Sequence, residues 1–280
     1  MGKILFLDID GTLINYSGVM PDSAREAVME ARKKSHRVYT CTGCSKYEIL
    51  LRLKDLEVDG YIGANGGYLE DNGKELLHTT FSDEQIGHIV NWCNSRNLGI
   101  ILECNSGLYA NREMLVKGKN ALYRYASGNG RSDQQAWKDA EKFLSDFIIM
   151  EDDQMYRDDV NKVSFTLDSY QTHLDSVKEF RDMEVNVWGS AEERALFGDL
   201  TVKGVTKKHA IELLLDHLKA DRKDAIAFGD SAIDIGMFEC CGFSVAMGNG
   251  DDKVKAAADY LSEDVDNDGL YKAFRYLKLI

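Results

Sequence analysis

Two segments of the sequence carry closely spaced carboxylates at the end of an apolar run. Asp8 lies near the end of the run 3–9 and Asp10 directly follows it, and Asp230 and Asp234 follow the run 225–228. Two like charges about 4 Å apart repel by roughly 4 kcal/mol at an effective dielectric constant near 20, so such a cluster needs a cation. An all-oxygen ligand set with room for water suits Mg²⁺. The pattern predicts a magnesium site, and the alternative is a set of solvated aspartates in turns and helix caps.

The elements around these residues explain why they would meet. A short, nearly continuous apolar run that ends in Asp10-Gly11-Thr12 is typical of a buried parallel strand that enters a tight turn. Open parallel sheets bind their ligands at the carboxyl ends of the strands. Because alternate residues of a strand face the same side, Asp8 and Asp10 would point together if the strand is still extended there. Both acidic pairs are therefore expected at one edge of one sheet.

The rest of the N-terminal part alternates strands and helices. Ser23 with Glu26, and Ser45 with Glu48, fit the capping-box pattern, which predicts helices that begin near residues 23 and 45. Strands are expected at 37–41 and 61–64, and the turn residues at 65–67 and 71–73 suit a hairpin. This order predicts a doubly wound α/β sheet.

From about residue 82 the pattern changes. Helical stretches near 83–96, 134–150 and 172–182 alternate with strand-like runs at 99–104, 107–111, 161–167 and 184–188. This texture predicts an α+β unit with its own small sheet. After it, a helix at 206–219, a strand at 225–228, a helix at 232–241 and a strand at 243–247 resume the parallel pattern. We expect a core domain of residues 1–81 and 198–280, with residues 82–197 inserted as a cap domain.

Composition narrows the function classes. The 280 residues carry a formal net charge of −13 and a pI near 5.0, which argues against the basic stripe that nucleic-acid binding needs. No apolar stretch reaches membrane-spanning length, and the N-terminus becomes acidic too early for a signal peptide. We expect no nucleic-acid partner, no membrane and a cytoplasmic location. The oligomeric state is not indicated.

A series of short motifs runs along nearly the whole chain. They are Asp8-x-Asp10-Gly-Thr12-Leu13, Thr42-Gly43, Lys207, Gly229-Asp230 with Asp234, the run 245–249 and Asp268-Gly-Leu270. In this order and spacing they resemble the motifs of the haloacid dehalogenase-like phosphatase superfamily, and within it the Cof-type branch with a large α/β cap. The resemblance implies a Rossmann-like core.

The resemblance also implies a role for each residue. Asp8 would attack phosphorus to give an aspartyl-phosphate, and Asp10 would protonate the leaving group and then activate water. Mg²⁺ would be held by Asp8, by the backbone carbonyl of Asp10 and by Asp230, with Asp234 direct or through water. The phosphate would be bound by Thr42, Gly43 and Lys207.

Two positions depart from the branch pattern. Cys44 stands where the branch usually has arginine after Thr42-Gly43, and Ile233 stands where an asparagine usually precedes Asp234. Neither change touches the nucleophile, the acid or the metal ligands. They put the usual substrate contacts in doubt rather than the chemistry.

A basic island lies inside the expected cap, between residues 111 and 131. Its cations are Arg112, Lys117, Lys119, Arg124 and Arg131. They could meet an anionic or sugar-like substrate, or they could simply be a solvated helix face and loop.

The sequence thus predicts a magnesium-dependent phosphatase for a small phosphorylated metabolite, plausibly a sugar phosphate. One alternative is a phosphomutase of the same superfamily, which would return the phosphoryl group to its substrate. Another is a catalytically silent binding or regulatory protein that kept the fold, which the residues at positions 44 and 233 would motivate.

Overall fold

Strand β1 (Ile4–Leu7) lies in the middle of the larger of two sheets and is buried on both faces. It pairs in parallel with β2 (Arg37–Cys41) on one side and with β12 (Ala225–Gly229) on the other. Leu5 and Leu7 belong to the apolar cluster on one face, whereas Ile4 and Phe6 belong to the cluster on the other. A strand covered on both faces needs an unbroken apolar run, which is the pattern in the sequence.

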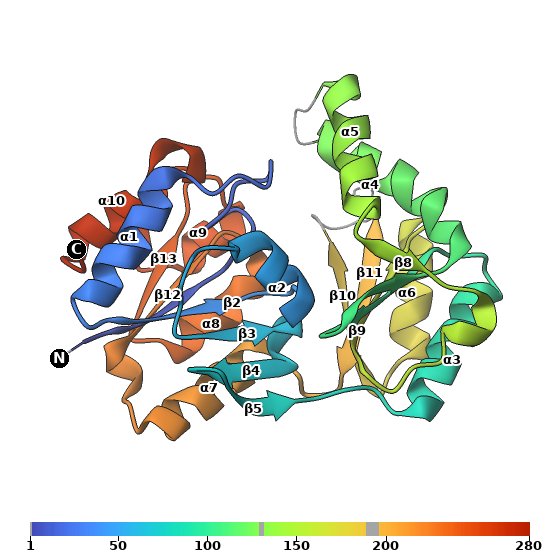
Figure 1. Cartoon of the computed structure of the whole chain (residues 1–280), viewed down its shortest axis with the longest axis horizontal. Coiled ribbons are helices and arrows are strands. Elements are labelled where there is room, and N and C mark those ends of the chain that lie inside the picture. The colour runs from blue at the N-terminus through green and yellow to red at the C-terminus, as the bar shows by residue number, and fades with distance from the viewer. Residues whose placement is uncertain (1, 129–131, 189–195) are drawn as a thin grey trace. The chain divides into compact units, whose positions relative to one another are not determined.

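The larger sheet has eight strands in the order β14-β13-β12-β1-β2-β3-β4-β5 (Figure 1). Its other strands are β3 (Gly60–Gly63), β4 (Tyr68–Asp71), β5 (Lys74–His78), β13 (Phe243–Ala246) and β14 (Tyr260–Leu261). The strands from β14 to β3 are parallel, and β4 and β5 add antiparallel ones at the edge. The expected hairpin turn is present, because Asn72 and Gly73 both have positive φ, as a two-residue type I′ loop requires.

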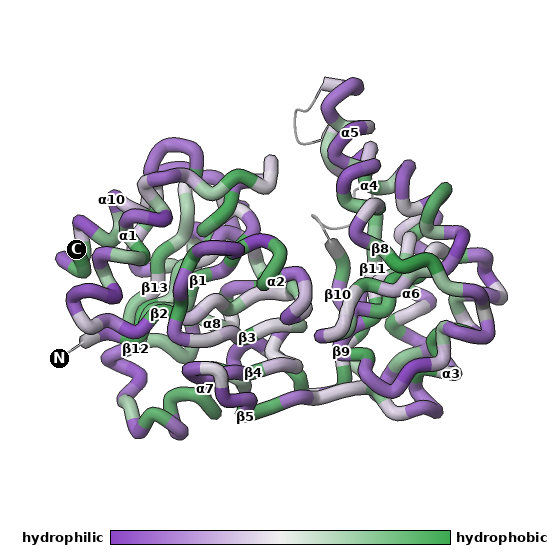
Figure 2. The backbone as a smooth tube through the Cα atoms, in the orientation of Figure 1, coloured by the Kyte–Doolittle hydropathy of each residue, from purple (hydrophilic) through white to green (hydrophobic). Residues whose placement is uncertain are grey.

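Helices cover both faces of this sheet, which makes it doubly wound as predicted. One face carries α1 (Asp22–Lys33), α2 (Lys46–Leu53) and α10 (Gly269–Tyr276), and the other carries α7 (Lys207–Leu218), α8 (Ile235–Cys240) and α9 (Asp252–Ala257). In Figure 2 the hydrophobic colour follows the strand β12, whereas α1 alternates between the two colours. This alternation is typical of an amphipathic helix, and the buried residues of α1 are those on the side that faces the sheet.

The two predicted capping boxes have different outcomes. At α2 the box is formed: the backbone N–H of Ser45 donates to Glu48 Oε2 at 2.8 Å, and the N–H of Glu48 donates to Ser45 Oγ at 3.4 Å. At α1 the helix begins at Asp22, close to the predicted residue 23, but the predicted capping box is wrong, because the N-cap is Pro21, which has no side-chain hydrogen bond to offer.

The structure is a computed structural model that describes residues 2–128, 132–188 and 196–280. It divides into two units. The first holds the large sheet and comprises Met1–Cys44, Ile49–His78 and Val205–Ile280, and the second comprises Ser45–Glu48 and Thr79–Gly204.

The second unit has its own six-stranded sheet, in the order β10-β11-β9-β6-β7-β8. The strands are β6 (Ile100–Cys104), β7 (Gly107–Ala110), β8 (Phe147–Ile149), β9 (Val160–Thr166), β10 (Met183–Trp188) and β11 (Phe197–Val202). Neighbours are antiparallel except β7 and β8. The helices are α3 (Asp83–Asn94), α4 (Lys117–Gly128), α5 (Asp133–Leu144) and α6 (Tyr170–Glu179).

Three details of this unit differ from the expectation. The helix expected at 134–150 ends at Leu144, and β8 follows, where Phe147 is buried beside β7. The helix α4 was not expected. The boundary expected after residue 197 falls inside β11, which pairs with β9 and β10, so the second unit runs to Gly204.

No helix in the described part of the chain has both the length and the hydrophobicity that crossing a membrane requires.

Candidate active site

The candidate catalytic residues follow neighbouring parallel strands of the first unit. Leu7 of β1 is paired with Phe228 of β12, and the backbone N–H of Asp8 continues the ladder by donating to Phe228 O at 3.0 Å. Asp230 comes directly after β12. Asp8 and Asp230 therefore leave the sheet at the same carboxyl edge, as expected from the order of the strands.

The structure brings three of the predicted carboxylates together. Asp8, Asp230 and Asp234 are all buried, and each offers an oxygen such that these oxygens lie within 4.8 Å of one another. The ammonium of Lys207 is the cation beside them, and it leaves two negative charges in excess when all groups are ionised. Hard carboxylate oxygens with excess negative charge fit a divalent cation such as Mg²⁺.

Lys207 is the first residue of α7 and is itself buried. Its Nζ donates to Asp8 Oδ1 at 2.8 Å and to Asp234 Oδ1 at 2.7 Å. A lysine in the first turn of a helix is unfavourable with the macrodipole. Here the two carboxylates offset that cost, because they hold the ammonium in a buried, charge-assisted network.

The pKa shifts follow from burial and from these charges. Burial raises the pKa of Asp8 well above its ordinary value; Lys207 lowers it, and Asp234 and Asp230 raise it again. Burial alone would lower the pKa of Lys207, but Asp234 and Asp8 more than offset this, so its pKa is raised. Burial, followed by the charge of Asp234, raises the pKa of Asp230 to about 7. Without a bound cation, the raised pKa values make the carboxyls of Asp8 and Asp230 harder to ionise than those of free aspartates.

Asp234 differs from its neighbours in how many hydrogen bonds it accepts. Besides Lys207, its carboxylate accepts the backbone N–H groups of Asp230 and Ser231, each at 3.0 Å, and the Ser231 hydroxyl at 3.1 Å. Three of these bonds go to Oδ2, and Oδ1 accepts only the one from Lys207, so Oδ1 keeps a lone-pair site that a cation could use. Asp234 thus fixes the loop after β12, anchors Lys207 and still offers an oxygen to the cluster.

Asp230 is held from the loop that follows β1. Thr12 Oγ1 donates to Asp230 Oδ1 at 3.2 Å, and the Tyr16 hydroxyl donates to Oδ2. Gly11 makes this approach possible: its φ is +82°, and a Cβ there would lie 2.1 Å from Asp230 Oδ2. Sequence reasoning missed Tyr16, and its place near Asp10-Gly11-Thr12 is the one signal that could have found it.

Thr42 and Gly43 lie just after β2, the other neighbour of β1. Thr42 is buried, its backbone N–H donates to Ile62 O at 2.9 Å, and its Oγ1 accepts the N–H of Cys44 at 3.2 Å. The bend after β2 therefore presents a hydroxyl at the same sheet edge as Asp8. No described contact joins the Thr42 side chain to Asp8, so its phosphate role stays a prediction.

Asp10 has surroundings that the sequence did not reveal. Its Oδ1 forms an ion pair with Arg52 of α2, and its Oδ2 lies 3.7 Å from the Cys44 thiol. Its carboxylate is 41% exposed, unlike that of Asp8. Ile233, the second departure from the expected pattern, is exposed on the loop before Asp234.

Gly66 is a second residue that sequence reasoning missed. Its φ is +106°, and a Cβ would lie 2.3 Å from the carbonyl oxygen of Thr206, the N-cap of α7. The turn after β3 can therefore approach the start of α7 closely enough to place Lys207. The signal is the Asn65-Gly66-Gly67 run, which by itself indicates only a turn.

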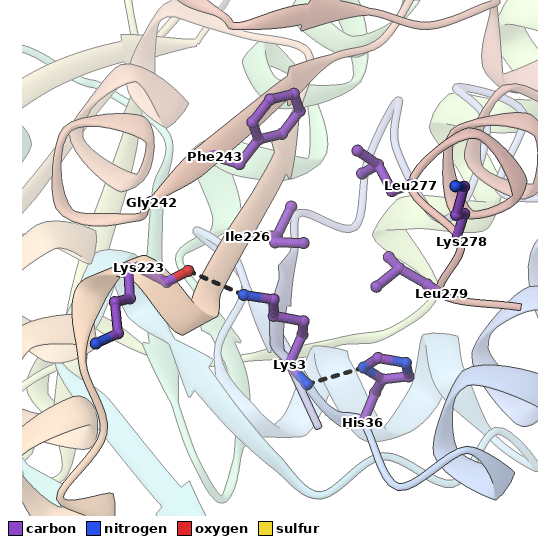
Figure 3. Close-up of a pocket in the computed structure, with 9 residues that line it drawn as sticks. All are labelled: Lys3, His36, Lys223, Ile226, Gly242, Phe243, Leu277, Lys278 and Leu279. Carbon is purple, nitrogen blue, oxygen red and sulfur yellow. Dashed lines mark hydrogen bonds between the residues drawn. The ribbon is translucent and has the colours of Figure 1, made fainter. Parts of the chain in front are cut away.

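A hollow of about 450 Å³ lies at the opposite, amino edge of the sheet (Figure 3). Its polar groups are largely used within the fold. Lys3 Nζ donates to Lys223 O at 3.0 Å and contacts Asp224 at 3.4 Å, and the N–H of Lys3 donates to His36 Nδ1 at 2.9 Å. These contacts join the starts of β1, β2 and β12, so we assign the hollow a structural role.

The basic island of the second unit is partly neutralised. Arg112 pairs with Glu151, Lys117 with Asp168 at 2.9 Å, and Lys119 with Glu141 at 2.7 Å. Arg131 lies outside the described residues. These exposed pairs favour the interpretation as a solvated surface.

With the fold and the acidic cluster in place, comparison with known proteins defines the class. A family model described as haloacid dehalogenase-like hydrolase matches residues 5–274. The chain belongs to this family and is a hydrolase of its Cof type, of the phosphoric monoester class.

Its relatives include two proteins of Bacillus subtilis (strain 168). The putative phosphatase YkrA is 23% identical over 282 residues, covering 99% of this chain and 98% of YkrA. The 5-amino-6-(5-phospho-D-ribitylamino)uracil phosphatase YwtE is 25% identical over 279 residues, covering 96% and 95%. The structure of a haloacid dehalogenase-like hydrolase from B. subtilis matches with a TM-score of 0.84 at 23% identity, covering 98% of this chain and 99% of that one.

Proposed function

We propose that this protein is a magnesium-dependent phosphatase of a small phosphorylated metabolite, with Asp8 as its nucleophile. The observation that carries the proposal is the meeting of three buried carboxylates and one buried ammonium at the carboxyl edge of the parallel sheet. With all groups ionised the cluster carries two negative charges in excess, and buried charges are tolerated only when something compensates them, which a bound divalent cation would do.

The reaction would proceed in two steps. Asp8 attacks phosphorus, an Asp8 oxygen–phosphorus bond forms, the bond to the leaving oxygen breaks, and Asp10 gives that oxygen a proton. Water then attacks the phosphorus of the aspartyl-phosphate and Asp10 takes its proton, so that inorganic phosphate and free Asp8 result. Two smaller barriers replace one larger barrier.

The donor set fits Mg²⁺. Asp8, Asp230 and the backbone carbonyl of Asp10 would hold the ion, with Asp234 direct or through water, since its Oδ1 accepts only the hydrogen bond from Lys207. Bound there, the ion would reduce the repulsion between Asp8 and a phosphate dianion.

Lys207 and the Thr42-Gly43 bend would bind the phosphoryl oxygens. Lys207 has an ammonium beside Asp8 Oδ1, where charge on the transferred group would lie in the transition state. Thr42 would donate from its hydroxyl, and Gly43 would donate from its backbone N–H group.

A small phosphorylated substrate is supported by the relatives, of which YwtE is named for a phosphoribityl compound. A sugar-like phosphate ester is therefore our first choice of substrate class. We assign selectivity to the second unit, which we interpret as the cap.

The test is phosphate release from p-nitrophenyl phosphate and a panel of sugar phosphates, with and without Mg²⁺. The wild type should release phosphate only with Mg²⁺, and Asp8→Asn should lose activity by at least about a thousandfold. The matched control is Asp216→Asn, an exposed aspartate of α7, which should keep wild-type activity.

Other outcomes separate the alternatives. An isomerised sugar phosphate with little free phosphate would favour a mutase, and no turnover of any substrate would favour a binding protein. Full activity in Asp8→Asn would contradict the proposed nucleophile.

A further inference from the structure

Both carboxylate oxygens of Asp10 contact the segment formed by α2 and the residue two positions before it. Arg52, in the last turn of α2, forms an ion pair with Oδ1, and the Cys44 thiol, just before α2, lies 3.7 Å from Oδ2. A guanidinium gives a strong, directional, charge-assisted bond, whereas a thiol is a weak donor. The two oxygens are therefore unequal: Oδ1 is fixed and Oδ2 is easily released.

The backbone of α2 that carries Arg52 is held in place by packing. Its neighbours on α2, Ile49 and Leu53, are buried in the apolar cluster beneath the helix, so the Cα of Arg52 is fixed relative to the sheet. The side chain of Arg52 is 28% exposed and that of Asp10 is 41% exposed. A pair this accessible contributes little to stability, because water competes for both partners. What the pair does to the orientation of Asp10 is therefore the more consequential effect.

An exposed carboxylate without such a partner would rotate about its side-chain torsions. A general acid works only when its proton lies within hydrogen-bond reach of the leaving oxygen, and small misplacements cost large factors in rate. Arginine suits the task of fixing the carboxylate, because it keeps its charge through the reaction and takes no part in proton transfer.

We propose that Arg52 is a positioning residue that fixes Asp10 by Oδ1 and leaves Oδ2 as the oxygen that exchanges the proton. The proposal rests on the proposed function. In the first step Oδ2 gives its proton to the leaving oxygen; in the second it takes one from the attacking water. Arg52 keeps all its protons throughout, and the Cys44 thiol turns away from Oδ2 when substrate arrives.

Leaving-group dependence tests this. Phenyl phosphate and p-nitrophenyl phosphate have similar size, but phenolate is the poorer leaving group and needs more help from an acid. The ratio kcat/KM reports the steps up to cleavage of the ester bond. Arg52→Gln should lower kcat/KM about 10- to 100-fold on phenyl phosphate and less than about threefold on p-nitrophenyl phosphate, since general acid catalysis contributes about 10²–10⁴. Arg52→Lys should recover part of the loss.

The matched control is Arg32→Gln. Arg32 of α1 has the same 28% exposure and also pairs with carboxylates, Glu57 and Asp59, but none of its described contacts reaches the acidic cluster. It should leave the ratio between the two substrates unchanged. Thermal unfolding of each variant, compared with that of wild type, checks that the fold is kept.

Two results would overturn the proposal. Equal losses of kcat on both substrates with KM unchanged would mean that Arg52 supports the fold, and a higher KM with unchanged kcat on both would mean that it binds the substrate phosphate. Failure of the proposed function itself would be seen separately, as wild-type protein that hydrolyses neither ester or as Asp8→Asn that hydrolyses both.

Discussion

Lys207 places its Nζ 2.8 Å from Oδ1 of Asp8, although 199 positions separate the two residues in the chain. The second unit of the structure lies between them in sequence. The contact therefore exists only when the chain returns to the first sheet and α7 packs against it.

We expect removal of this ammonium to damage both stability and activity. Lys207→Met leaves Asp8 and Asp234 buried without a cation, and breaking such a buried pair costs about 3–5 kcal/mol of unfolding free energy. Phosphate release should fall about 10²–10³-fold, as when one donor to the transition state is lost. Urea denaturation and steady-state kinetics measure the two effects.

The adjacent lysine is the control for that variant. Lys208 is exposed and pairs with Glu239, so Lys208→Met should leave both quantities close to wild type. Similar behaviour of the two variants would contradict the role of Lys207.

The increase in unfolding temperature that Mg²⁺ causes should depend on pH. The pKa of Asp230 is raised to about 7, against about 3.9 in an unfolded chain. Between these values the folded protein binds more protons than the unfolded one, so without metal the free energy of unfolding should fall as pH rises from about 4 to 7. Mg²⁺ needs the carboxylate, so the increase in unfolding temperature that it causes should grow from pH 5 to pH 8.

The pH experiment has its own control in Asp230→Asn. Without metal, the free energy of unfolding of this variant should depend less on pH than that of wild type. With Mg²⁺, its unfolding temperature should increase less. A Mg²⁺ effect of the same size at pH 5 and pH 8 in wild-type protein would argue against Asp230 as a ligand.

Alanine variants of Gly11 and Gly18 distinguish the effect of backbone strain from the effect of contact with Asp230. Their φ angles are +82° and +74°, so alanine should cost roughly 1–2 kcal/mol of stability at either position. A Cβ on Gly11 would also meet Asp230 Oδ2 at 2.1 Å, whereas one on Gly18 would meet no atom of the described residues within 4 Å. Only Gly11→Ala should weaken Mg²⁺ binding, by about 10-fold or more. Calorimetric titration measures it, and equal affinities in the two variants would refute the argument.

The second unit contains a buried ion pair that should behave differently from surface pairs. Lys162 of β9 contacts Glu103 of β6 at 2.9 Å, and burial raises the pKa of Glu103 to about 8. Lys162→Met alone should cost about 3–5 kcal/mol, whereas the double variant with Glu103→Leu should regain most of it, because apolar side chains then replace both partners of the pair. Chemical denaturation of the single and double variants tests this, and additive losses would show that the pair is not coupled.

The sequence determined that the first sheet is parallel around its centre and that the catalytic carboxylates follow its strands. The apolar runs around residues 4–7 and 225–229 predict buried parallel strands, and parallel strands must end at one edge, so the sequence alone is enough to place Asp8 and Asp230 together. The hairpin at Asn72-Gly73 and the capping box at Ser45 were also predictable, because both depend on residues near in sequence.

Only the tertiary structure decided how the site is held. The long-range contacts of Arg52 with Asp10, of Tyr16 with Asp230 and of Gly66 with Thr206 join segments that no local pattern links. The same holds for β11, whose place in the second sheet depends on pairing with β9 on one side and with β10 on the other. Local propensity and periodicity predict the secondary structure of a segment and the face that it buries. The partner of a polar side chain depends on how distant segments pack. For this reason the sequence alone did not predict the contacts around Asp8.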